Sequence, residues 1–234
     1  RFQLKVMGRN KKNASRRDEI ALSDDAPLAS NSSRSVAVSE GPRRVLLLRH
    51  GQSVANETGD DIPDAELTAL GRTQASAWRD HIGSLGAEVV LASPLRRAVE
   101  TACLAFEKET TPIEICRPAR ELWWDEKQNT PGTPVQMLRY LQDLPRGDQV
   151  ECVDEALVPG PNEPSSESES IRQLHEILSL RPEASVAVVC HWGVINSLCE
   201  ASASNCEIIE CEWTKSRRLK VVKHHRPPGA PRTS

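Results

Sequence analysis

Runs of consecutive apolar residues mark the strands that this chain is expected to form. The two clearest runs, at 45–48 and 185–190, lack alternating polar positions, which is typical of strands buried on both faces of a parallel sheet. Shorter runs predict strands at 88–92, 113–116, 207–213 and 219–222. No apolar run approaches the roughly 20 residues that a spanning helix needs, so we expect no membrane span.

Four helices are expected between these strands, and each begins at a Ser or Thr that can accept hydrogen bonds from the first turn. Ser93 and Thr133 are followed by proline, which suits the first helical position because the N–H there has no partner within the helix. The helices, each starting at its cap, are predicted at 68–85, 93–108, 133–144 and 166–180. The stretch 145–164 contains four prolines and is expected to be a loop.

The alternation of strand and helix predicts an α/β domain, which we expect to occupy residues 43–223. The preceding segment, 1–42, is polar and rich in Ser, Arg and Asn, without sustained periodicity. It is therefore expected to be disordered or a linker. Residues 224–234 are expected to form a basic, proline-rich tail in which the pair His224-His225 is solvated.

Charge is distributed unevenly along the chain. Residues 1–44 carry 10 Lys or Arg against 5 Asp or Glu, and residues 213–234 carry 7 Lys or Arg and no acid. The middle, 45–212, carries 13 Lys or Arg against 28 Asp or Glu. Solvated tails are the simplest interpretation of the basic ends. Aromatic residues, 3% of the chain, are too few to suggest stacking on single strands, so we expect no specific nucleic-acid binding.

The seven cysteines form no CxxC pair, no zinc-type spacing and no disulfide framework of a small domain. Several lie in apolar segments, where a free thiol packs as a small hydrophobic group. We therefore expect a reducing, intracellular compartment, with the cytoplasm as the predicted location. The Arg- and Ser-rich first 44 residues leave targeting to an organelle open, although four clustered acidic residues there are atypical of a transit peptide.

Candidate chemistry lies directly after three of the predicted strands. Arg49 and His50 follow the first strand, Arg96 and Arg97 come shortly after the second, and His191 follows the 185–190 strand. In α/β sheets these strand ends converge, so a cationic cluster is expected there. Arginine binds phosphate oxygens in pairs, and neutral imidazole is a competent phosphoryl nucleophile. Of the two neighbouring arginines, we expect Arg97 to face the site and Arg96 to be a surface charge.

Four elements in this order resemble the histidine phosphatase (phosphoglycerate mutase-like) superfamily. The first, Arg49-His50-Gly51-Gln52-Ser53 with Asn56, is similar to the family's R-H-G-x-S-x-x-N signature. The others are Leu67-Thr68-Ala69-Leu70-Gly71 with Gln74-Ala75, Ser93-Pro94-Leu95-Arg96-Arg97 with Thr101-Ala102, and Val188-Val189-Cys190-His191-Trp192-Gly193. The resemblance implies a three-layer α/β/α sandwich with a mostly parallel central sheet, and a phosphoglycerate mutase-like phosphatase domain at 43–223.

The resemblance also implies roles for individual residues. His50 would accept the phosphoryl group, while Arg49, Arg97 and His191 would hold the phosphate oxygens. Asn56 would lie near the phosphate, and Gly51 would allow close backbone approach. Ser53 would either bind substrate or cap local backbone. The implied activity is a metal-independent, cofactor-free phosphatase that hydrolyses a small phosphomonoester through a phosphohistidine.

The motifs leave open which residue is the general acid that protonates the leaving oxygen. The stretch Arg120-Glu121-Leu122-Trp123-Trp124-Asp125-Glu126 places Asp125 on the acid position when matched to plant-like members that read E-L-x-x-E. Matched to the L-N-E pattern of the phosphofructokinase-linked bisphosphatase, it places Glu121 there. Flanking tryptophans would raise the pKa of the acid by desolvation. We rank Asp125 first, Glu121 second and Glu126 third.

Three other functions compete with hydrolysis. A mutase of the same family is disfavoured because only eleven residues separate Asn56 from Leu67, without the longer G-W-x-D-like segment of phosphoglycerate mutases. A non-catalytic phosphate-binding regulatory module would keep Arg49 and Arg97 without a working acid. A hydrolase with a metal on His50 and His191 is disfavoured because the adjacent arginines repel a cation.

Overall fold

A computed structural model describes residues 44–160, 163–214 and 218–229 of the chain. The segment 1–42, for which we predict disorder or a linker, lies outside these residues. None of the helices within them has the length and apolar character that crossing a membrane requires.

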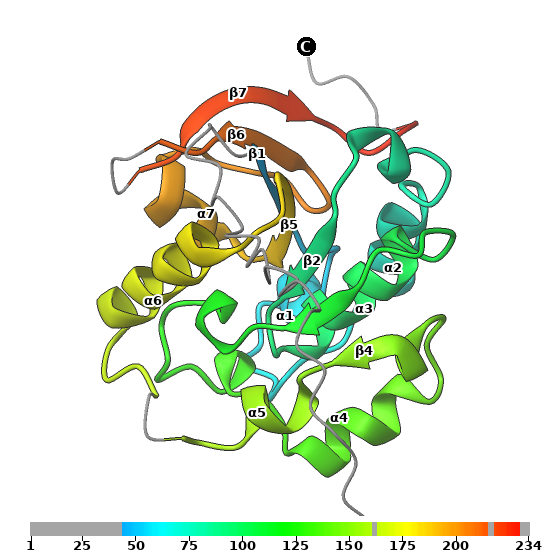
Figure 1. Cartoon of the computed structure of the whole chain (residues 1–234). Coiled ribbons are helices and arrows are strands. Elements are labelled where there is room, and N and C mark those ends of the chain that lie inside the picture. Colours follow the sequence, from blue (N-terminus) through cyan, green and yellow to red (C-terminus); the bar gives the residue numbers. More distant parts are fainter. Residues whose placement is uncertain (1–43, 161–162, 215–217, 230–234) are drawn as a thin grey trace, which may run out of the picture. The chain divides into compact units, whose positions relative to one another are not determined.

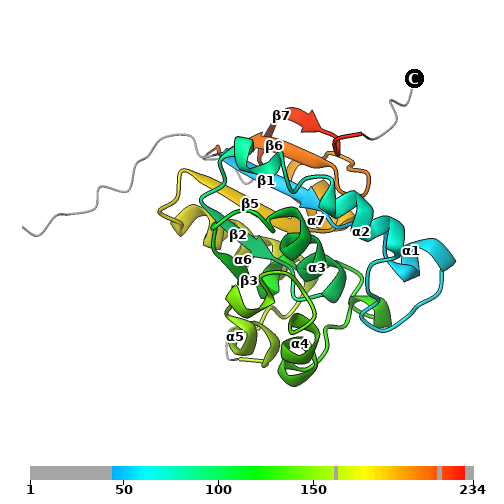
Figure 2. The same cartoon turned by 90° about the vertical axis from the view of Figure 1, so that its right-hand side faces the viewer.

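Seven strands form one sheet, in the spatial order β4-β3-β2-β5-β1-β6-β7 (Figures 1 and 2). The buried positions of the central strands β1 and β2 are all apolar, and so are those of β5 apart from Ser185, as the continuous hydrophobic runs predict. The strands are β1 (Arg44–Arg49), β2 (Val89–Ala92), β3 (Ile113–Ile115), β4 (Val150–Glu151), β5 (Ser185–Cys190), β6 (Ile208–Glu212) and β7 (Lys220–His225).

The direction and register of the central strands determine where the site lies. Strand β5 pairs in parallel with both β1 and β2, whereas β6 pairs antiparallel with β1 and β7. Arg49 is opposite Cys190, and Ala92 is opposite Val189. The residues that follow β1, β2 and β5 therefore emerge side by side at one edge of the sheet.

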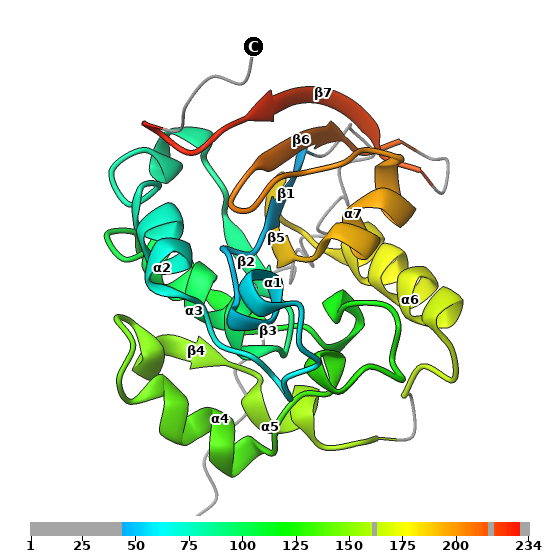
Figure 3. The same ribbon diagram turned by 180° about the vertical axis from the view of Figure 1, so that it is seen from behind.

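Helices cover both faces of this sheet, so the fold is a three-layer α/β/α sandwich. Alternate residues of β1 divide between the layers: Val45 and Leu47 pack with α6 and α7, whereas Leu46 and Leu48 pack with α2 and α3. Figures 1 and 3 show the two helix layers on opposite sides of the sheet. The helices are α1 (Val54–Thr58), α2 (Ala69–Ser76), α3 (Arg96–Ala105), α4 (Pro134–Leu141), α5 (Val153–Leu157), α6 (Glu167–Leu180) and α7 (Trp192–Cys199).

The first predicted helix, 68–85, is shorter than its hydrophobic pattern indicates. Thr68 caps it as expected, but α2 ends at Ser76 and turns lead to a 3-10 helix at Ile82–Leu85. The side chain of Trp78 is buried, and its indole N–H donates to the carbonyl of Cys206 at 2.7 Å. This tertiary contact holds the chain where the helix would otherwise continue.

The predicted N-cap at Ser93 is wrong. Helix α3 begins at Arg96, its N-cap is Leu95, and no side chain caps it. The Ser93 hydroxyl instead lies 2.7 Å from Nε2 of His191, and it accepts a hydrogen bond from Leu95 N–H at 3.3 Å. A contact with the second histidine therefore replaces the local cap.

Two further predictions differ from the structure. The stretch 145–164 is not only loop, because it contributes β4 and α5. Strand β7 continues to His225, beyond the point at which we expected the tail to start. Each of the two histidines contacts a carboxylate on or beside β6: His224 with Glu207 at 3.0 Å and His225 with Glu210 at 2.6 Å.

Candidate active site

His50 is held in one tautomer by the backbone after β1. Its Nδ1 lies 2.7 Å from the carbonyl oxygen of Gly51, which can only accept, so Nδ1 carries the proton. Burial and the charges of Arg97 and Arg49 lower the pKa of His50 well below its usual range. The ring is therefore neutral near pH 7, with the Nε2 lone pair available. Arg97 Nε–H points at this lone pair from 3.4 Å.

His191 follows β5 and lies against His50, with ring centroids 4.9 Å apart. It is fully buried, and desolvation lowers its pKa well below the usual range. One ring nitrogen, Nε2, is engaged by Ser93, while Nδ1 is buried with no hydrogen-bond partner among the described residues. A buried polar atom without a partner is costly, so Nδ1 is suited to meet a ligand.

Arg97 and Arg49 supply the positive charge of the site. Arg97 is nearly fully buried and donates to the carbonyl of Gln128 at 2.7 Å and to Asn129 Oδ1 at 2.8 Å. Burial lowers its pKa to about 10, which leaves it protonated near pH 7. Arg49 donates from one terminal nitrogen to Ala203, but its buried Nε has no partner in the described part of the chain. Two neighbouring cations, together with the unused Nε–H of Arg49, favour an anionic ligand.

Among the three candidate acids, the structure brings Glu121 to the histidines. Glu121 is buried and lines the same cavity as His50, whereas Asp125 is exposed and does not. Burial raises the pKa of Glu121, although hydrogen bonds from Leu122 and Gly193 and the charge of Arg97 oppose this effect. Glu126 also lines the cavity. The carboxyl group of Glu121 is therefore both close to the cations and easier to protonate than an exposed one.

The loop that carries Glu121 is strained and is held by one amide. Trp123 has a φ of 59°, a left-handed conformation that costs a bulky residue about 1–3 kcal/mol. Asn129 Nδ2 donates to the carbonyls of Leu122 at 2.9 Å and Trp123 at 3.2 Å. The same side chain accepts from Arg97. Asn129 thus joins Arg97 to the acid loop, the segment 121–126 that holds the three candidate acids.

Gly193, in the first turn of α7, leaves room for this loop. A Cβ there would lie 2.6 Å from Glu121 Oε1 and 2.9 Å from the ring of Trp123. Gly193 N–H also donates to Glu121 Oε2 at 3.4 Å. The glycine after His191-Trp192 is therefore needed for the close approach of the acid loop.

The motif at 67–75 holds the motif at 49–53 in place and does not itself line the cavity. Gln74 Oε1 accepts from Gln52 N–H at 2.9 Å, and Thr68 Oγ1 donates to the Gln52 side chain at 2.8 Å. This contact between the motifs also explains Gly51: a Cβ there would lie 2.6 Å from the carbonyl oxygen of Gly71. Close approach at Gly51 is thus to the backbone of α2.

The remaining predicted ligands separate into two groups. Asn56 lines the cavity from α1, beside His50. Ser53 is fully buried and caps α1, accepting from Asn56 N–H at 3.2 Å, so its hydroxyl serves the local backbone. Figure 3 places α1 between the two helix layers, near the ends of β1 and β2.

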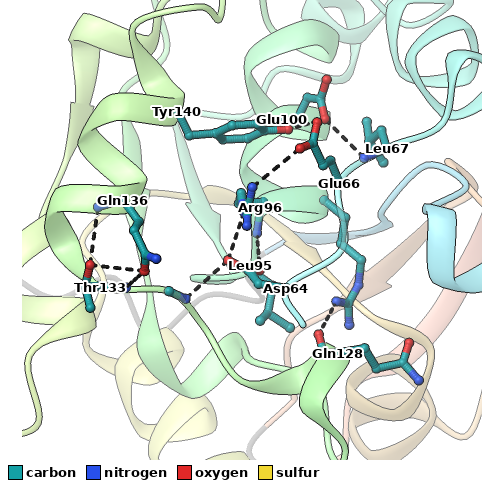
Figure 4. Close-up of polar contacts among 12 residues, drawn as sticks. Asp64, Glu66, Leu67, Leu95, Arg96, Glu100, Gln128, Thr133, Gln136 and Tyr140 are labelled. Carbon is teal, nitrogen blue, oxygen red and sulfur yellow. Dashed lines mark hydrogen bonds and ion pairs between the residues drawn. The ribbon is translucent and has the colours of Figure 1, made fainter. Parts of the chain in front are cut away.

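Arg96 does not line the cavity of His50 and instead lies among Asp64, Glu66 and Tyr140 (Figure 4). Its Nε donates to buried Asp64 at 3.2 Å, and its guanidinium carbon lies 5.4 Å from the centre of the Tyr140 ring. Asp64 also accepts from the backbone N–H groups of Arg96 at 2.9 Å and Gly132 at 3.2 Å. This network ties the segment before α2 to α3 and to the start of α4, next to the loop that holds Arg97.

These groups surround one cavity of about 360 Å³, at the small end of the roughly 300–1,000 Å³ range of small-molecule sites. Its lining combines both arginines, His50, Glu121 and two indoles. In the described residues, no group of three or more His, Cys, Asp or Glu side chains is arranged to hold a metal ion. The lining residues are Arg49, His50, Asn56, Arg97, Glu121, Trp123, Glu126, Gln128, Asn129 and Trp192.

A family model described as the histidine phosphatase superfamily (branch 1) matches residues 45–209. That match covers well over half of the sequence, and the chain therefore belongs to the histidine phosphatase superfamily. The matched range includes both histidines, both arginines and the acid loop.

Curated relatives match shorter parts of the chain. Glucosyl-3-phosphoglycerate phosphatase of Mycobacterium tuberculosis is 37% identical over 82 residues, which are 34% of this chain and 36% of that protein. The 5''-phosphoribostamycin phosphatase of Niallia circulans is 34% identical over 119 residues, covering 47% of this chain and 55% of that protein. Phosphoglycerate mutase-like protein 1 of Arabidopsis thaliana is 36% identical over 80 residues, covering 29% and 28%. The chain thus spans less than two thirds of each relative.

Solved structures share the fold over most of the chain. A protein described as mycobacterial hydrolase 1 has a TM-score of 0.53 at 22% identity, covering 78% of this chain and 97% of that one. Mycobacterial glucosyl-3-phosphoglycerate phosphatase in complex with VO3 has a TM-score of 0.52 at 23% identity, covering 77% and 97%. At sequence identities this low, the similarity to these structures shows a shared fold.

Two residues make contacts in the site that their sequence context does not reveal. Ser93 belongs to the third resembling element but is predicted to be a helix cap, and Asn129 belongs to no such element. The proline after Ser93 gives a strong local reason for a cap, so only the position of His191 reveals the other contact. Three of the four partners of Asn129 lie within seven positions of it in the sequence, and the fourth, Arg97, is distant, so nothing local indicates that contact.

Proposed function

We propose that the protein is a phosphomonoester phosphatase that works through a phosphohistidine at His50. Nε2 of His50 attacks phosphorus, a P–N bond forms, and the P–O bond to the leaving group breaks. Glu121, protonated, gives its proton to the departing oxygen. Arg49, Arg97 and Nδ1 of His191, in the tautomer that carries the proton on that atom, stabilise the charge on the three other phosphoryl oxygens.

Water completes the cycle in the second step. The Glu121 carboxylate takes a proton as the water oxygen attacks phosphorus, and the P–N bond breaks. Inorganic phosphate leaves, His50 is neutral again and Glu121 is again protonated. All charge stabilisation in this scheme comes from side chains of the chain itself.

The observation that carries the proposal is the state of His50. Its Nδ1–H is fixed by a carbonyl, its pKa is lowered, and its Nε2, which carries the lone pair, accepts a long hydrogen bond of 3.4 Å from Arg97 Nε–H. The unpartnered Nε–H of Arg49, which lines the same cavity, and the unpartnered Nδ1 of His191, whose ring packs against His50, add support for a phosphoryl ligand. Two of the relatives named above are phosphatases, which agrees with hydrolysis. The short segment between Asn56 and Leu67 further favours hydrolysis over a mutase.

The test is hydrolysis of an aryl phosphate, with EDTA present, by the wild type and by His50→Ala. We expect turnover by the wild type and only the uncatalysed background with the variant. Quenching with SDS at alkaline pH during turnover should trap, on the wild type alone, a phosphoryl group that is stable to alkali and lost in acid. Full activity of His50→Ala would overturn the assignment. Phosphate binding by a wild type without turnover on any substrate would favour the regulatory module.

A further inference from the structure

Two exposed indoles stand at the mouth of the cavity. Trp123 is 44% exposed and Trp192 is 37% exposed, although tryptophan is highly buried on average. Their rings are nearly parallel, at 19°, with centroids 6.2 Å apart. Both line the cavity that contains His50 and Glu121. The exposed faces are therefore part of the site and not a separate surface patch.

Both rings are held in place by specific contacts. The Trp192 indole N–H donates to Ser202 Oγ at 3.0 Å, which satisfies its polar edge. Trp123 is fixed by its strained backbone, by the Asn129 amide and by its contact with Gly193. A left-handed tryptophan persists only where its surroundings hold it, and such strain is concentrated at ligand sites.

We place the indoles on the leaving-group side of the proposed reaction, because the Trp123 ring and the carboxyl group of Glu121, the proposed proton donor for the leaving oxygen, both lie against Gly193. The Trp192 ring lies beside that of Trp123. Inserting a ring between two indoles would require about 7 Å, twice a carbon contact distance. The separation of 6.2 Å is too small, so a ring would stack on the outer face of the pair.

We propose that Trp123 and Trp192 form a subsite for a leaving group that contains a ring with an apolar face, either a sugar or an aromatic ring. This inference rests on the proposed function and names its substrate class. Glu126 and Gln128 also line the cavity and provide polar partners beside the indoles. An acyclic leaving group offers no flat apolar face, so it gains little from the stacked pair.

The experiment compares kcat/KM for three primary alkyl phosphates, so that the chemistry of the breaking bond is alike. Glucose 6-phosphate provides a sugar ring, benzyl phosphate an aromatic ring and glycerol 1-phosphate no ring. We expect the wild type to prefer at least one ring-bearing substrate about three- to tenfold, the size of an aromatic stacking contribution. Trp123→Leu and Trp192→Leu should abolish that preference, mainly through KM. Which ring is preferred identifies its source.

Trp124→Leu is the matched control, because Trp124 packs on Arg120 and does not line the cavity. It should keep the ring preference. Equal losses on ring-bearing and acyclic substrates in the Trp123 and Trp192 variants would overturn the subsite. So would a wild type that hydrolyses all three substrates equally well in a His50-dependent manner, and this result would leave the proposed function intact.

Binding without turnover tests the subsite separately from catalysis. Benzylphosphonate and butylphosphonate, which have no P–O bond to a leaving group, are compared by calorimetric titration of the wild type and the Trp192→Leu variant. We expect tighter binding of benzylphosphonate to the wild type only. Equal affinities in both proteins, together with a ring preference absent in turnover, would refute the inference. Absence of His50-dependent turnover alone would refute the proposed function.

Discussion

The hydroxyl of Ser93 lies 2.7 Å from Nε2 of His191, across the ends of β2 and β5. This contact leaves Nδ1 of His191 directed to no other described residue. Ser93 therefore positions a ring that the phosphoryl group is proposed to meet. In Ser93→Ala we expect kcat/KM to fall about tenfold, because a hydrogen bond of this kind contributes about 1–1.5 kcal/mol. Thr at the same position, which retains a hydroxyl, should restore most of the activity, and an unrescued Thr variant would contradict the positioning role.

Replacement of Glu121 should affect substrates according to their leaving groups. Glu121→Gln removes the proton that the departing oxygen receives, so hydrolysis of an alkyl phosphate should slow by about 10²–10⁴-fold. An aryl phosphate with an acidic phenol leaves without that proton and should slow far less in the phosphorylation step. The control is Asp125→Asn, an exposed position outside the cavity. A larger loss for Asp125→Asn than for Glu121→Gln would reverse the assignment.

The pH dependence of kcat/KM follows from two opposite pKa shifts. His50 must be neutral to attack, and its pKa is lowered, so activity should rise with pH through a range below that of an ordinary histidine. Glu121 must be protonated, and its pKa is raised, so activity should fall as pH rises through a range above that of an ordinary glutamate. In Glu121→Gln the alkaline decline assigned to Glu121 should disappear. Its persistence would assign that limb to another group.

Inorganic phosphate should stabilise the protein through Arg97 and not through Arg96. At a phosphate concentration of 100 times Kd, the stabilisation is about 2.7 kcal/mol, visible as a rise in Tm of several degrees. Arg97→Met should abolish this rise. Arg96→Met loses the contact with Asp64 and lowers the starting Tm, but the phosphate-dependent rise should remain. Thermal scans with and without phosphate separate the two effects, and an unchanged rise in Arg97→Met would exclude Arg97 from the phosphate site.

A methyl group at position 193 should displace the acid loop. The new Cβ would lie 2.6 Å from Glu121 Oε1, so the carboxyl group must move. A displacement of about 1 Å costs on the order of 10²-fold in rate, and Gly193→Ala should show such a loss on alkyl phosphates. Gly160→Ala is the control, since a Cβ there meets nothing within 4 Å and activity should be unchanged. Wild-type rates for Gly193→Ala would show that the loop tolerates the displacement.

The central strands and the two histidines were predictable because the relevant forces are local along the chain, whereas β4 lies in a stretch predicted to be a loop. A strand buried on both faces, such as β5, requires an uninterrupted apolar run, and parallel neighbours bring the following residues together. His50 and His191 are therefore placed by hydrophobicity and register. The helix ends were less predictable, because Trp78 and Ser93 bond to groups that are distant in the sequence.

The residue that we propose as the general acid was the least predictable. Glu121, Asp125 and Glu126 lie within six positions, and local propensity does not determine which carboxylate turns inward. That choice depends on the missing side chain of Gly193 and on the amide of Asn129. Both lie outside the acid segment, and their effect appears only once α7 and the loop before α4 are in place.

The amide side chain of Asn129 connects Arg97, the proposed phosphate-binding cation, to the segment that bears Glu121. Asn129 accepts from Arg97 and donates to Leu122 and Trp123. The ordering of the Arg97 side chain and the ordering of this loop are therefore energetically coupled. By linkage, an anion that immobilises the guanidinium of Arg97 also reduces the mobility of residues 122–128. A change that makes that segment more mobile weakens the affinity for the anion by the same factor. Phosphate binding should therefore slow proteolytic cleavage and amide hydrogen exchange in residues 122–128, a segment that the phosphate itself need not touch.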